Sequence, residues 1–155
     1  MFIDFSKAYD MLQRSKLFNV LKRLGCGMVM LGALTAMYRE TESLVGTALF
    51  TATLGVRQVS LTACLLVIFY IDELLKIIKE RCMPGEFLDW LHILVLMDDT
   101  VLLSTSRVNL IRKVEILGEF CRYYGMIVHY DKTKFFFNFF IHGEDNDRDT
   151  IHVND

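Results

Sequence analysis

The chain has 155 residues, of which 53% are hydrophobic and 23% charged, and its formal net charge is -2. These values exclude an intrinsically disordered chain, which combines low hydrophobicity with high net charge, and nine Gly and one Pro exclude a collagen-like or proline-rich chain. The balance of 17 Lys+Arg against 19 Asp+Glu carries no basic signature of nucleic-acid binding, so net charge leaves the partner open.

Cysteine usage and the absence of long apolar runs bear on location. The four cysteines form no C-x-x-C pair of the kind a structural zinc site needs; they are Cys26, Cys64, Cys82 and Cys121. We therefore expect reduced thiols in the core of an intracellular protein, in the nucleus or the cytoplasm. The uncharged runs 25–38 and 58–71 fall short of the roughly 18 to 20 apolar residues of a membrane span, so no membrane partner is expected. High apolar content without such a span predicts a broad surface that another domain or a partner covers.

The first part of the chain alternates between short extended and longer helical patterns. Residues 1–5 are apolar apart from Asp4 and predict a strand. Apolar residues at helical spacing predict one helix from about Tyr9 to Leu24, and a second over about 28–38 that is apolar on nearly every side and therefore largely buried. Residues 43–53 suit one extended segment, which leads into a polar turn at 55–58.

The middle of the chain predicts a long helix, a hairpin and another helix. The first helix spans about 62–81. Two apolar runs, 92–97 and 100–103, are separated only by Asp98 and Asp99, which is the pattern of a tight β-hairpin with two acids at its tip. A further helix covers about 107–124, with Ser106 as N-cap, Gly125 as C-terminal stop and one apolar face made of Leu110, Ile111, Val114, Leu117 and Cys121.

The last part of the chain predicts two short strands and a tail. The strands cover 126–128 and 135–141, and residues 142–155 form an acidic tail that we expect to be disordered. The order of strands and helices indicates an α+β fold, an antiparallel sheet with helices packed on one face, in a single domain over residues 1–141.

Three acids stand out because charged side chains are rarely buried in apolar strands without a reason. Asp4 lies in an apolar strand, and Asp98 and Asp99 lie between two apolar runs. If Asp4 ends a strand beside the hairpin, these carboxylates could share divalent ions such as Mg²⁺, which prefer carboxylate oxygens and can promote phosphoryl transfer. An ordinary solvated turn is the alternative, since Asp is common in turns.

Four short segments occur in an order that carries more information than any one of them. They are residues 2–10 (FIDFSKAYD), residues 55–58 (GVRQ) followed by Ser60, residues 96–103 (LMDDTVLL), and residues 125–126 (GM) with 131–134 (DKTK). Together they resemble the successive palm motifs of reverse transcriptases, and most of all those of the non-LTR retrotransposon branch. The resemblance extends from Met1 to about Phe140 and implies a polymerase palm-like fold.

The resemblance also implies roles for particular residues. Asp4, Asp98 and Asp99 would be the metal ligands for two Mg²⁺ ions and, with Lys132 near the leaving pyrophosphate, the catalytic group. Nucleotide-binding positions would be Phe5, Tyr9, Arg57 and Gln58, with the Tyr9 ring under the nucleotide sugar. The implied reaction is RNA-directed DNA synthesis, with an RNA template, a DNA primer and deoxynucleoside triphosphates as partners. Each residue also has a plainer interpretation: Tyr9 could pack at a helix start, and Lys7, Arg57 and Lys132 could be solvated charges.

Several positions depart from the family pattern. After GVRQ the family usually has Gly-Ser-Pro, whereas this chain has Val59, Ser60 and Leu61. Valine adds bulk where a glycine lets the backbone approach the nucleotide, and Leu61 lacks the fixed φ with which proline begins a helix. Leu96 stands where the family has an aromatic residue before the two acids. The metal-binding acids are retained, but their supporting residues have changed.

The chain begins at the first of these segments, without the fingers region that precedes it in the family, and without the thumb that follows the palm. We therefore expect a truncated, partly degenerate palm domain with little or no polymerase activity in isolation. Its exposed apolar surface would be one that the missing fingers and thumb normally cover. Three classes of function stay open: an enzyme that needs its missing parts, a non-catalytic remnant that binds RNA or protein, and a small interaction module.

Overall fold

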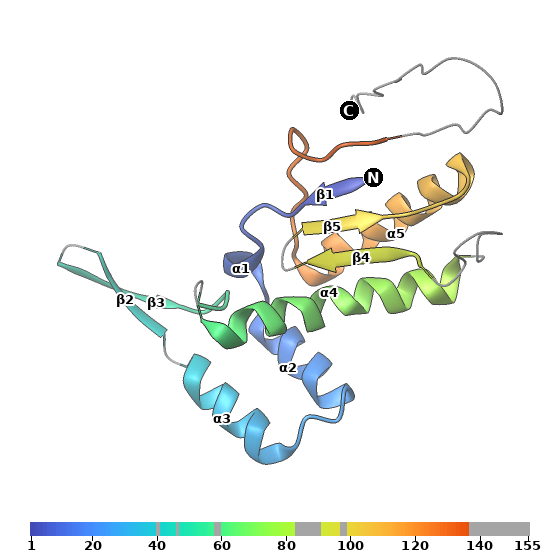
Figure 1. Ribbon diagram of the computed structural model, residues 1–155. Helices are drawn as coiled ribbons and strands as arrows, with labels where there is room; N and C mark the ends of the chain where they lie inside the picture. The colour runs from blue at the N-terminus through green and yellow to red at the C-terminus, as the bar shows by residue number, and fades with distance from the viewer. Residues whose placement is uncertain (40, 46, 58–59, 83–90, 97–98, 137–155) are drawn as a thin grey trace, which may run out of the picture.

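A computed structural model of the chain describes residues 1–39, 41–45, 47–57, 60–82, 91–96 and 99–136. It confirms the α+β class and shows helices beside a small antiparallel sheet, with a separate two-stranded hairpin projecting from one end (Figure 1). The elements are β1 Phe2–Asp4, α1 Ala8–Met11, α2 Arg14–Arg23, α3 Met28–Arg39, β2 Thr41–Val45, β3 Ala48–Ala52, α4 Leu61–Arg81, β4 Ile93–Leu96, β5 Asp99–Leu102 and α5 Arg107–Tyr124.

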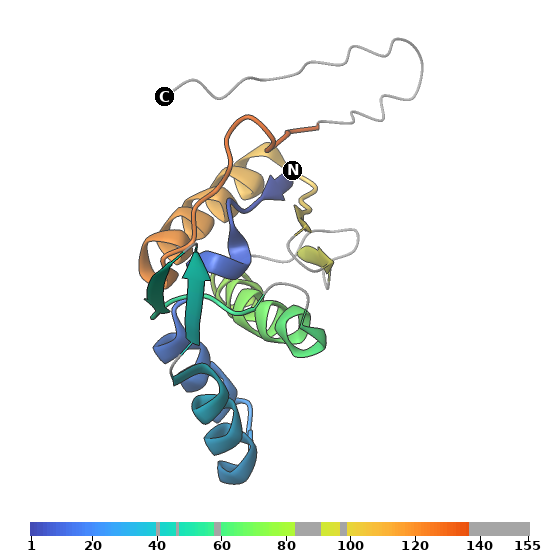
Figure 2. The ribbon, with the colours of Figure 1, turned by 90° about the vertical axis from the view of Figure 1, so that its left-hand side faces the viewer.

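The main sheet has the strand order β1-β5-β4, so the N-terminal strand pairs with the second strand of the predicted hairpin. Both pairings are antiparallel: Phe2 lies opposite Val101, and Ile93 lies opposite Leu102. The long helix α4 packs against β4 and α5, and Figure 2, turned by 90°, shows α4 and α5 on the same side of the sheet. The predicted arrangement of helices on one face is therefore confirmed.

The core is one cluster of buried side chains in which α4 contributes the centre. Tyr70 is fully buried in α4, and its hydroxyl donates to the carbonyl oxygen of Tyr124 at the end of α5, 2.6 Å away. Its ring meets those of Phe120 and Tyr124 edge to face, with centroids 6.5 and 5.0 Å apart. These contacts fasten α4 to the C-terminal end of α5.

Burial of Tyr70 makes the fold sensitive to alkaline pH. Loss of water around the phenol raises the pKa of Tyr70 well above its ordinary value of 10.0. In the unfolded chain this tyrosine ionises near pH 10, whereas in the folded chain it keeps its proton, so its contribution to stability is complete below pH 10 and is lost as pH rises further. We expect the free energy of unfolding, measured by urea titration at several pH values, to decrease less steeply above pH 10 in Tyr70→Phe than in the parent. The exposed Tyr130→Phe is the control, and an unchanged slope in Tyr70→Phe would contradict the assignment.

The helix predicted from Tyr9 to Leu24 is wrong in one respect, because it is two helices, α1 and α2, separated at Leu12 and Gln13. Both residues at the break have extended backbone angles. The cause is tertiary: the amide of Gly55 donates to the carbonyl of Leu12, and the amide of Val56 donates to the carbonyl of Tyr9, each at 2.8 Å. Those carbonyls are thereby taken by a distant segment instead of a continuous helix.

Arg14, the first residue of α2, holds the same region together. Its side chain is buried, and its guanidinium donates to the carbonyl oxygens of Gly55 at 2.8 Å, Tyr38 and Ala52 at 2.6 Å, and Leu54 at 3.0 Å. Burial lowers the pKa of this arginine from its ordinary value. One side chain therefore connects α2, the end of α3 and the segment that follows β3.

The prediction that the helix over about 28–38 is largely buried is also wrong. Helix α3 has nearly the predicted ends, but Tyr38 is its one buried residue, and Val29 is 89% exposed. The helix packs on α2 and lies far from the main sheet (Figure 1). Its apolar residues thus form part of an exposed apolar surface, and what covers that surface stays a prediction.

Three further predictions need correction. Residues 43–53 are not one extended segment, because the chain reverses between β2 and β3. Residues 126–128 do not form a strand, because only Val128 makes an isolated bridge, to Phe5. Of the strand predicted over 135–141, the described residues 135–136 are not in a strand, and the isolated bridge to Phe2 is made by the preceding Lys134. On α5 the buried face is turned from the predicted one: Ile111 is exposed, and the buried residues are Leu110, Lys113, Ile116, Leu117, Phe120 and Tyr124.

The ends of α5 are as predicted. The Ser106 side chain accepts a hydrogen bond from the amide of Asn109 at 3.2 Å, and Gly125 ends the helix with a φ of 73°. The burial of Lys113 is predicted neither by the apolar periodicity of this helix nor by its capping residues. Its ammonium group donates to the carbonyl of Leu103 at 2.5 Å. Polar partners of this kind come from the loop before α5 and leave no periodic signal in the sequence.

Helices long and apolar enough to span a membrane are absent from the described residues. All four cysteines are free thiols; Cys82 is buried and the other three are half-buried. The predicted tail, 142–155, lies outside the described residues.

Candidate functional site

Two of the three predicted acids meet at one end of the main sheet. Asp4 is the last residue of β1, Asp99 is the first residue of β5, and the antiparallel register places them directly opposite each other. Side chains alternate along a strand, and since Ile3 and Phe5 are buried, Asp4 points the other way, with 28% of its side chain exposed. The apolar pattern of β1 thus fixes a carboxylate at the sheet end.

The hairpin places its acids differently from the prediction of two acids at its tip. Leu96 and Asp99 are paired across β4 and β5, so the two connecting residues are 97 and 98, and Asp99 belongs to the strand. Asp98, the other acid of this motif, lies outside the described residues.

Lys132 lies beside Asp4, with its Nζ atom 3.7 Å from Oδ2 of the carboxylate. The loop that carries it is fixed to β1 by two bonds: the amide of His129 donates to the carbonyl of Asp4 at 2.8 Å, and the amide of Asp4 donates to Thr133 Oγ1 at 3.4 Å. The predicted catalytic residues Asp4, Asp99 and Lys132 therefore come together from three distant parts of the chain.

These residues line an open depression of about 460 Å³, which we call the Asp4 depression; its lining is Phe2, Ile3, Asp4, Asp99, Lys132, Lys134 and Phe136. Two lysines and two acids thus face the same space. The rings of Phe2 and Phe136 meet edge to face at its margin, with centroids 5.6 Å apart. No sequence pattern predicts the contact between these two rings, because Phe2 and Phe136 lie near opposite ends of the described chain. Lys134, by contrast, belongs to the DKTK segment, residues 131–134, identified above.

The donor set suits a hard cation. Carboxylate oxygens are the ligands that Mg²⁺ prefers. The Lys132 ammonium group, 3.7 Å from Asp4, already attracts this carboxylate, so a metal ion would share Asp4 with it. Within the described ranges, no group of three His, Cys, Asp or Glu side chains converges to hold a metal ion. Two carboxylates are in place there, and the third predicted ligand, Asp98, is outside those ranges.

Facing carboxylates should carry a cost in stability. Like charges directly opposite on paired strands destabilise a sheet. We expect Asp99→Asn to raise the free energy of unfolding by about 0.2–1 kcal/mol in low salt, with the gain shrinking as salt screens the charges. Asp131→Asn, an exposed acid on the neighbouring loop, is the matched control. A lower stability of Asp99→Asn at every salt concentration would contradict the facing arrangement.

The predicted nucleotide-binding residues occupy a different region. Phe5 and Tyr9 belong to the buried core, and the Tyr9 hydroxyl donates to Cys64 Sγ at 3.5 Å. Arg57 is exposed and does not line the Asp4 depression, and Gln58 lies outside the described residues. Among the described residues, the structure therefore brings Asp4, Asp99 and Lys132 together, whereas Phe5, Tyr9 and Arg57 do not line the same depression.

The segment at Gly55 is nevertheless attached to the start of the chain. Gly55 has a φ of +78°, and a Cβ atom there would lie 2.8 Å from the carbonyl oxygen of Asp10. The close approach permits the two bonds to Tyr9 and Leu12 described above. Segment 2–10 and the described residues 55–57 of the second segment are thereby held against each other.

Comparison with known families identifies the chain. The family profile described as reverse transcriptase (RNA-dependent DNA polymerase) matches residues 1–152. The chain belongs to the reverse transcriptase family. The match includes β1, the β4–β5 hairpin and the loop of Lys132, and membership implies a nucleic-acid template and primer, nucleotide substrates and the divalent metal ions that this family generally uses. A search of curated proteins finds no match to this reverse transcriptase domain.

Proposed function

We propose that this reverse transcriptase domain is the palm of a non-LTR retrotransposon enzyme, and that the end of the main sheet is its site of nucleotidyl transfer. The observation that carries the proposal is the position of Asp4 directly opposite Asp99, with Lys132 3.7 Å from Asp4, inside a chain that matches the family over 152 residues. The order of the four sequence segments supports the non-LTR assignment.

The proposed reaction joins a primer to a nucleotide. The primer 3′-hydroxyl gives up its proton to solvent and its oxygen forms a bond to the α-phosphorus of a deoxynucleoside triphosphate; the bond from that phosphorus to the bridging oxygen breaks, and pyrophosphate leaves with the electron pair. Asp4, Asp98 and Asp99 would hold two Mg²⁺ ions, which supply charge neutralisation on the phosphate oxygens when bound. Lys132 orients the carboxylate of Asp4 and offers an ammonium group to the leaving pyrophosphate.

The proposed nucleotide-binding residues that the structure describes, Phe5, Tyr9 and Arg57, lie outside the lining of the Asp4 depression. Arg57 is exposed and can reach a phosphate or the template strand, and Gln58 follows it. The Tyr9 ring, which would lie under the nucleotide sugar, is fixed by its bond to Cys64, and Phe5 supports the strand that carries Asp4.

We further propose that the chain alone has little or no polymerase activity. Val59 and Leu61 replace the usual Gly and Pro beside the nucleotide segment, and Leu96, which is exposed beside Asp99, lacks the ring and hydroxyl of the usual aromatic residue. These changes leave the acids in place but remove contacts that would position a nucleotide.

Primer extension on an RNA template tests the proposal. With Mg²⁺, all four deoxynucleotides and added fingers and thumb segments of a related enzyme, we expect extension that falls by at least about a hundredfold in Asp4→Asn, in line with the loss of one electrostatic stabiliser. Asp131→Asn should keep the parent rate. No extension by the parent, even with fingers and thumb segments of a related enzyme added, would favour the alternative of a non-catalytic remnant that binds RNA or protein.

A further inference from the structure

A second surface of the domain combines cations with an exposed aromatic ring. It is a groove of about 330 Å³ between α2 and the end of α5, lined by Lys16, Asn19, Lys22, Arg23, Tyr123 and Tyr124, and we call it the α2–α5 groove. It shares no lining residue with the Asp4 depression. Three lining residues are cations and none is an acid, in a chain whose net charge is -2.

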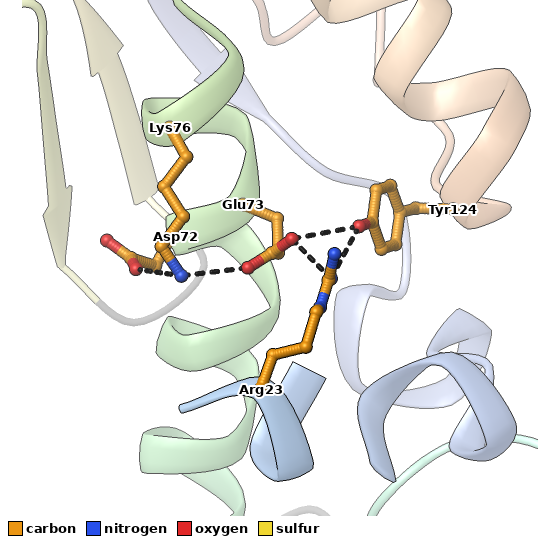
Figure 3. A network of polar contacts seen from close by, with 5 residues as sticks. All are labelled: Arg23, Asp72, Glu73, Lys76 and Tyr124. Atoms are coloured by element: carbon orange, nitrogen blue, oxygen red, sulfur yellow. Dashed lines mark hydrogen bonds and ion pairs between the residues drawn. The ribbon is translucent and has the colours of Figure 1, made fainter. Parts of the chain in front are cut away.

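Two of the cations at this groove, Lys16 and Arg23, are held in place by contacts with α4 and α5. The ammonium group of Lys16 donates to the carbonyl oxygen of Tyr123 and lies 4.3 Å from the centroid of the Tyr123 ring. Figure 3 shows Arg23 from α2 and Tyr124 from α5 on the same carboxylate, Glu73 of α4. Arg23 bonds to Glu73 at 2.5 Å and to the Tyr124 hydroxyl at 3.5 Å, both through Nη2, while 60% of its side chain stays exposed.

The charges around Glu73 indicate on which side of the groove an anionic ligand would lie. Glu73 is 8% exposed and is also bonded by Lys76 at 2.8 Å, so its negative charge is already balanced inside the molecule (Figure 3). The adjoining hollow along α4 contains the further acids Glu80 and Glu119 and the further cation Arg81, which is paired with Glu119 at 2.6 Å, so it has no excess of cations. An anionic chain is therefore favoured over α2, beside Lys16 and Lys22, and disfavoured along α4.

Tyr123 decides between kinds of anion. Its side chain is 65% exposed at the edge of the groove, next to the ammonium group of Lys16. Aromatic rings beside cations bind single-stranded nucleic acid, because bases stack on the ring while the cations contact phosphates. An acidic peptide would use the cations but would gain little from the ring.

We propose that the α2–α5 groove binds single-stranded nucleic acid, with phosphates on Lys16, Lys22 and Arg23 and a base on Tyr123, away from the site of nucleotidyl transfer. The proposal rests on the groove and on membership of the reverse transcriptase family, and it does not require the chain to be catalytically active. Such a contact would hold a template or transcript outside the Asp4 depression.

Fluorescence anisotropy with a labelled single-stranded RNA of about ten nucleotides, measured in EDTA, tests the proposal. We expect Lys16→Glu with Lys22→Glu to weaken binding at least tenfold and to reduce the slope of log affinity against log salt by about 1.4. Lys79→Glu with Arg107→Glu, two exposed cations away from the groove, is the charge-matched control and should weaken binding less than threefold. Equal losses in the two pairs would overturn the groove as the site.

Two further variants separate the ring from the charge and the groove from the Asp4 depression. Tyr123→Ala should weaken RNA binding about fivefold or more while Tyr123→Phe keeps it. Unchanged RNA affinity in Tyr123→Ala, together with polyglutamate binding by the parent that is lost in Lys16→Glu with Lys22→Glu, would overturn nucleic acid in favour of an acidic peptide. Asp4→Asn should bind RNA as the parent does, even if primer extension fails in every preparation. If the charge-reversed pair fails to fold by circular dichroism, Lys16→Gln with Lys22→Gln replaces it, and parent affinity in that pair overturns the proposal.

Discussion

Replacing Arg14 with methionine should lower the free energy of unfolding by about 3–6 kcal/mol, because a hydrogen bond to a charged group contributes about 1.5–3 kcal/mol and two of the bonds that this guanidinium makes are buried. Methionine fills similar space but donates no hydrogen bond. The carbonyls of Tyr38, Ala52, Leu54 and Gly55 would lose their common donor, and each buried carbonyl left without a partner costs free energy. The loss should therefore exceed that of an ordinary packing change.

Urea denaturation followed by circular dichroism measures this loss. Arg14→Lys should recover only a small part of the stability, because one ammonium group cannot reach four carbonyls that a planar guanidinium spans. Arg57→Met is the matched control at an exposed arginine in the same region and should change stability by less than about 0.5 kcal/mol. A loss below 1 kcal/mol in Arg14→Met would mean that these carbonyls find other donors, which contradicts the role assigned to Arg14.

Alanine at Gly55 should be the second strongly destabilising change, by about 2–4 kcal/mol. One part is the cost of a left-handed backbone conformation for a residue with a Cβ atom, about 1–2 kcal/mol. The other part is overpacking, since the new Cβ would lie 2.8 Å from the Asp10 carbonyl oxygen and 2.9 Å from the Asp10 Cα, both backbone atoms that cannot rotate away.

The chain contains a matched control for the two parts. Gly25 has a φ of +83°, close to that of Gly55, but a Cβ atom at Gly25 meets nothing within 4 Å. Gly25→Ala should therefore show the conformational cost alone. The difference between the two variants in a denaturant titration gives the cost of the close approach between residues 55 and 10. Equal losses in both would show that segment 55–57 does not press against α1.

Local patterns predicted the elements whose burial and ends are decided locally. The start of β1, the span of α4 and both ends of α5 follow from apolar periodicity, an N-cap serine and a C-terminal glycine. The break between α1 and α2 could not be predicted, because the bonds that cause it come from Gly55 and Val56, more than forty residues away in the chain. Arg14 looks like a solvated helix residue in sequence, and its burial depends on carbonyls from three other segments.

Exposure of α3 shows the opposite limit. An apolar helix predicts burial, but burial needs a partner surface, and the described residues place only part of one face of α3 against the rest of the domain. Apolar periodicity shows which face of a helix could be buried, but it does not show whether the fold places another surface against that face. The same limit applies to α5, whose buried face is set by α4 and the sheet and includes Lys113 in place of Ile111.

The candidate site could be predicted in outline and not in detail. An acid in an apolar strand and two acids in an apolar hairpin identified the end of the sheet, and the resemblance to reverse transcriptases added Lys132. The register that makes Asp99 the partner of Asp4 depends on how β1 pairs with β5, nearly a hundred residues apart, and no local pattern carries it. Placement of Tyr9 in the core is likewise a tertiary result.

We propose above that the carboxylates at the end of the main sheet form a divalent-cation site. Titration of the full chain with Mn²⁺, followed by electron paramagnetic resonance of the free ion, tests it most directly and needs no catalytic activity. We expect the parent to bind Mn²⁺ and competing Mg²⁺ to reverse that binding. The affinity for Mn²⁺ should fall at least tenfold in Asp4→Asn and in Asp98→Asn, and should be unchanged in Asp131→Asn. Equal binding by the parent and Asp4→Asn would contradict it.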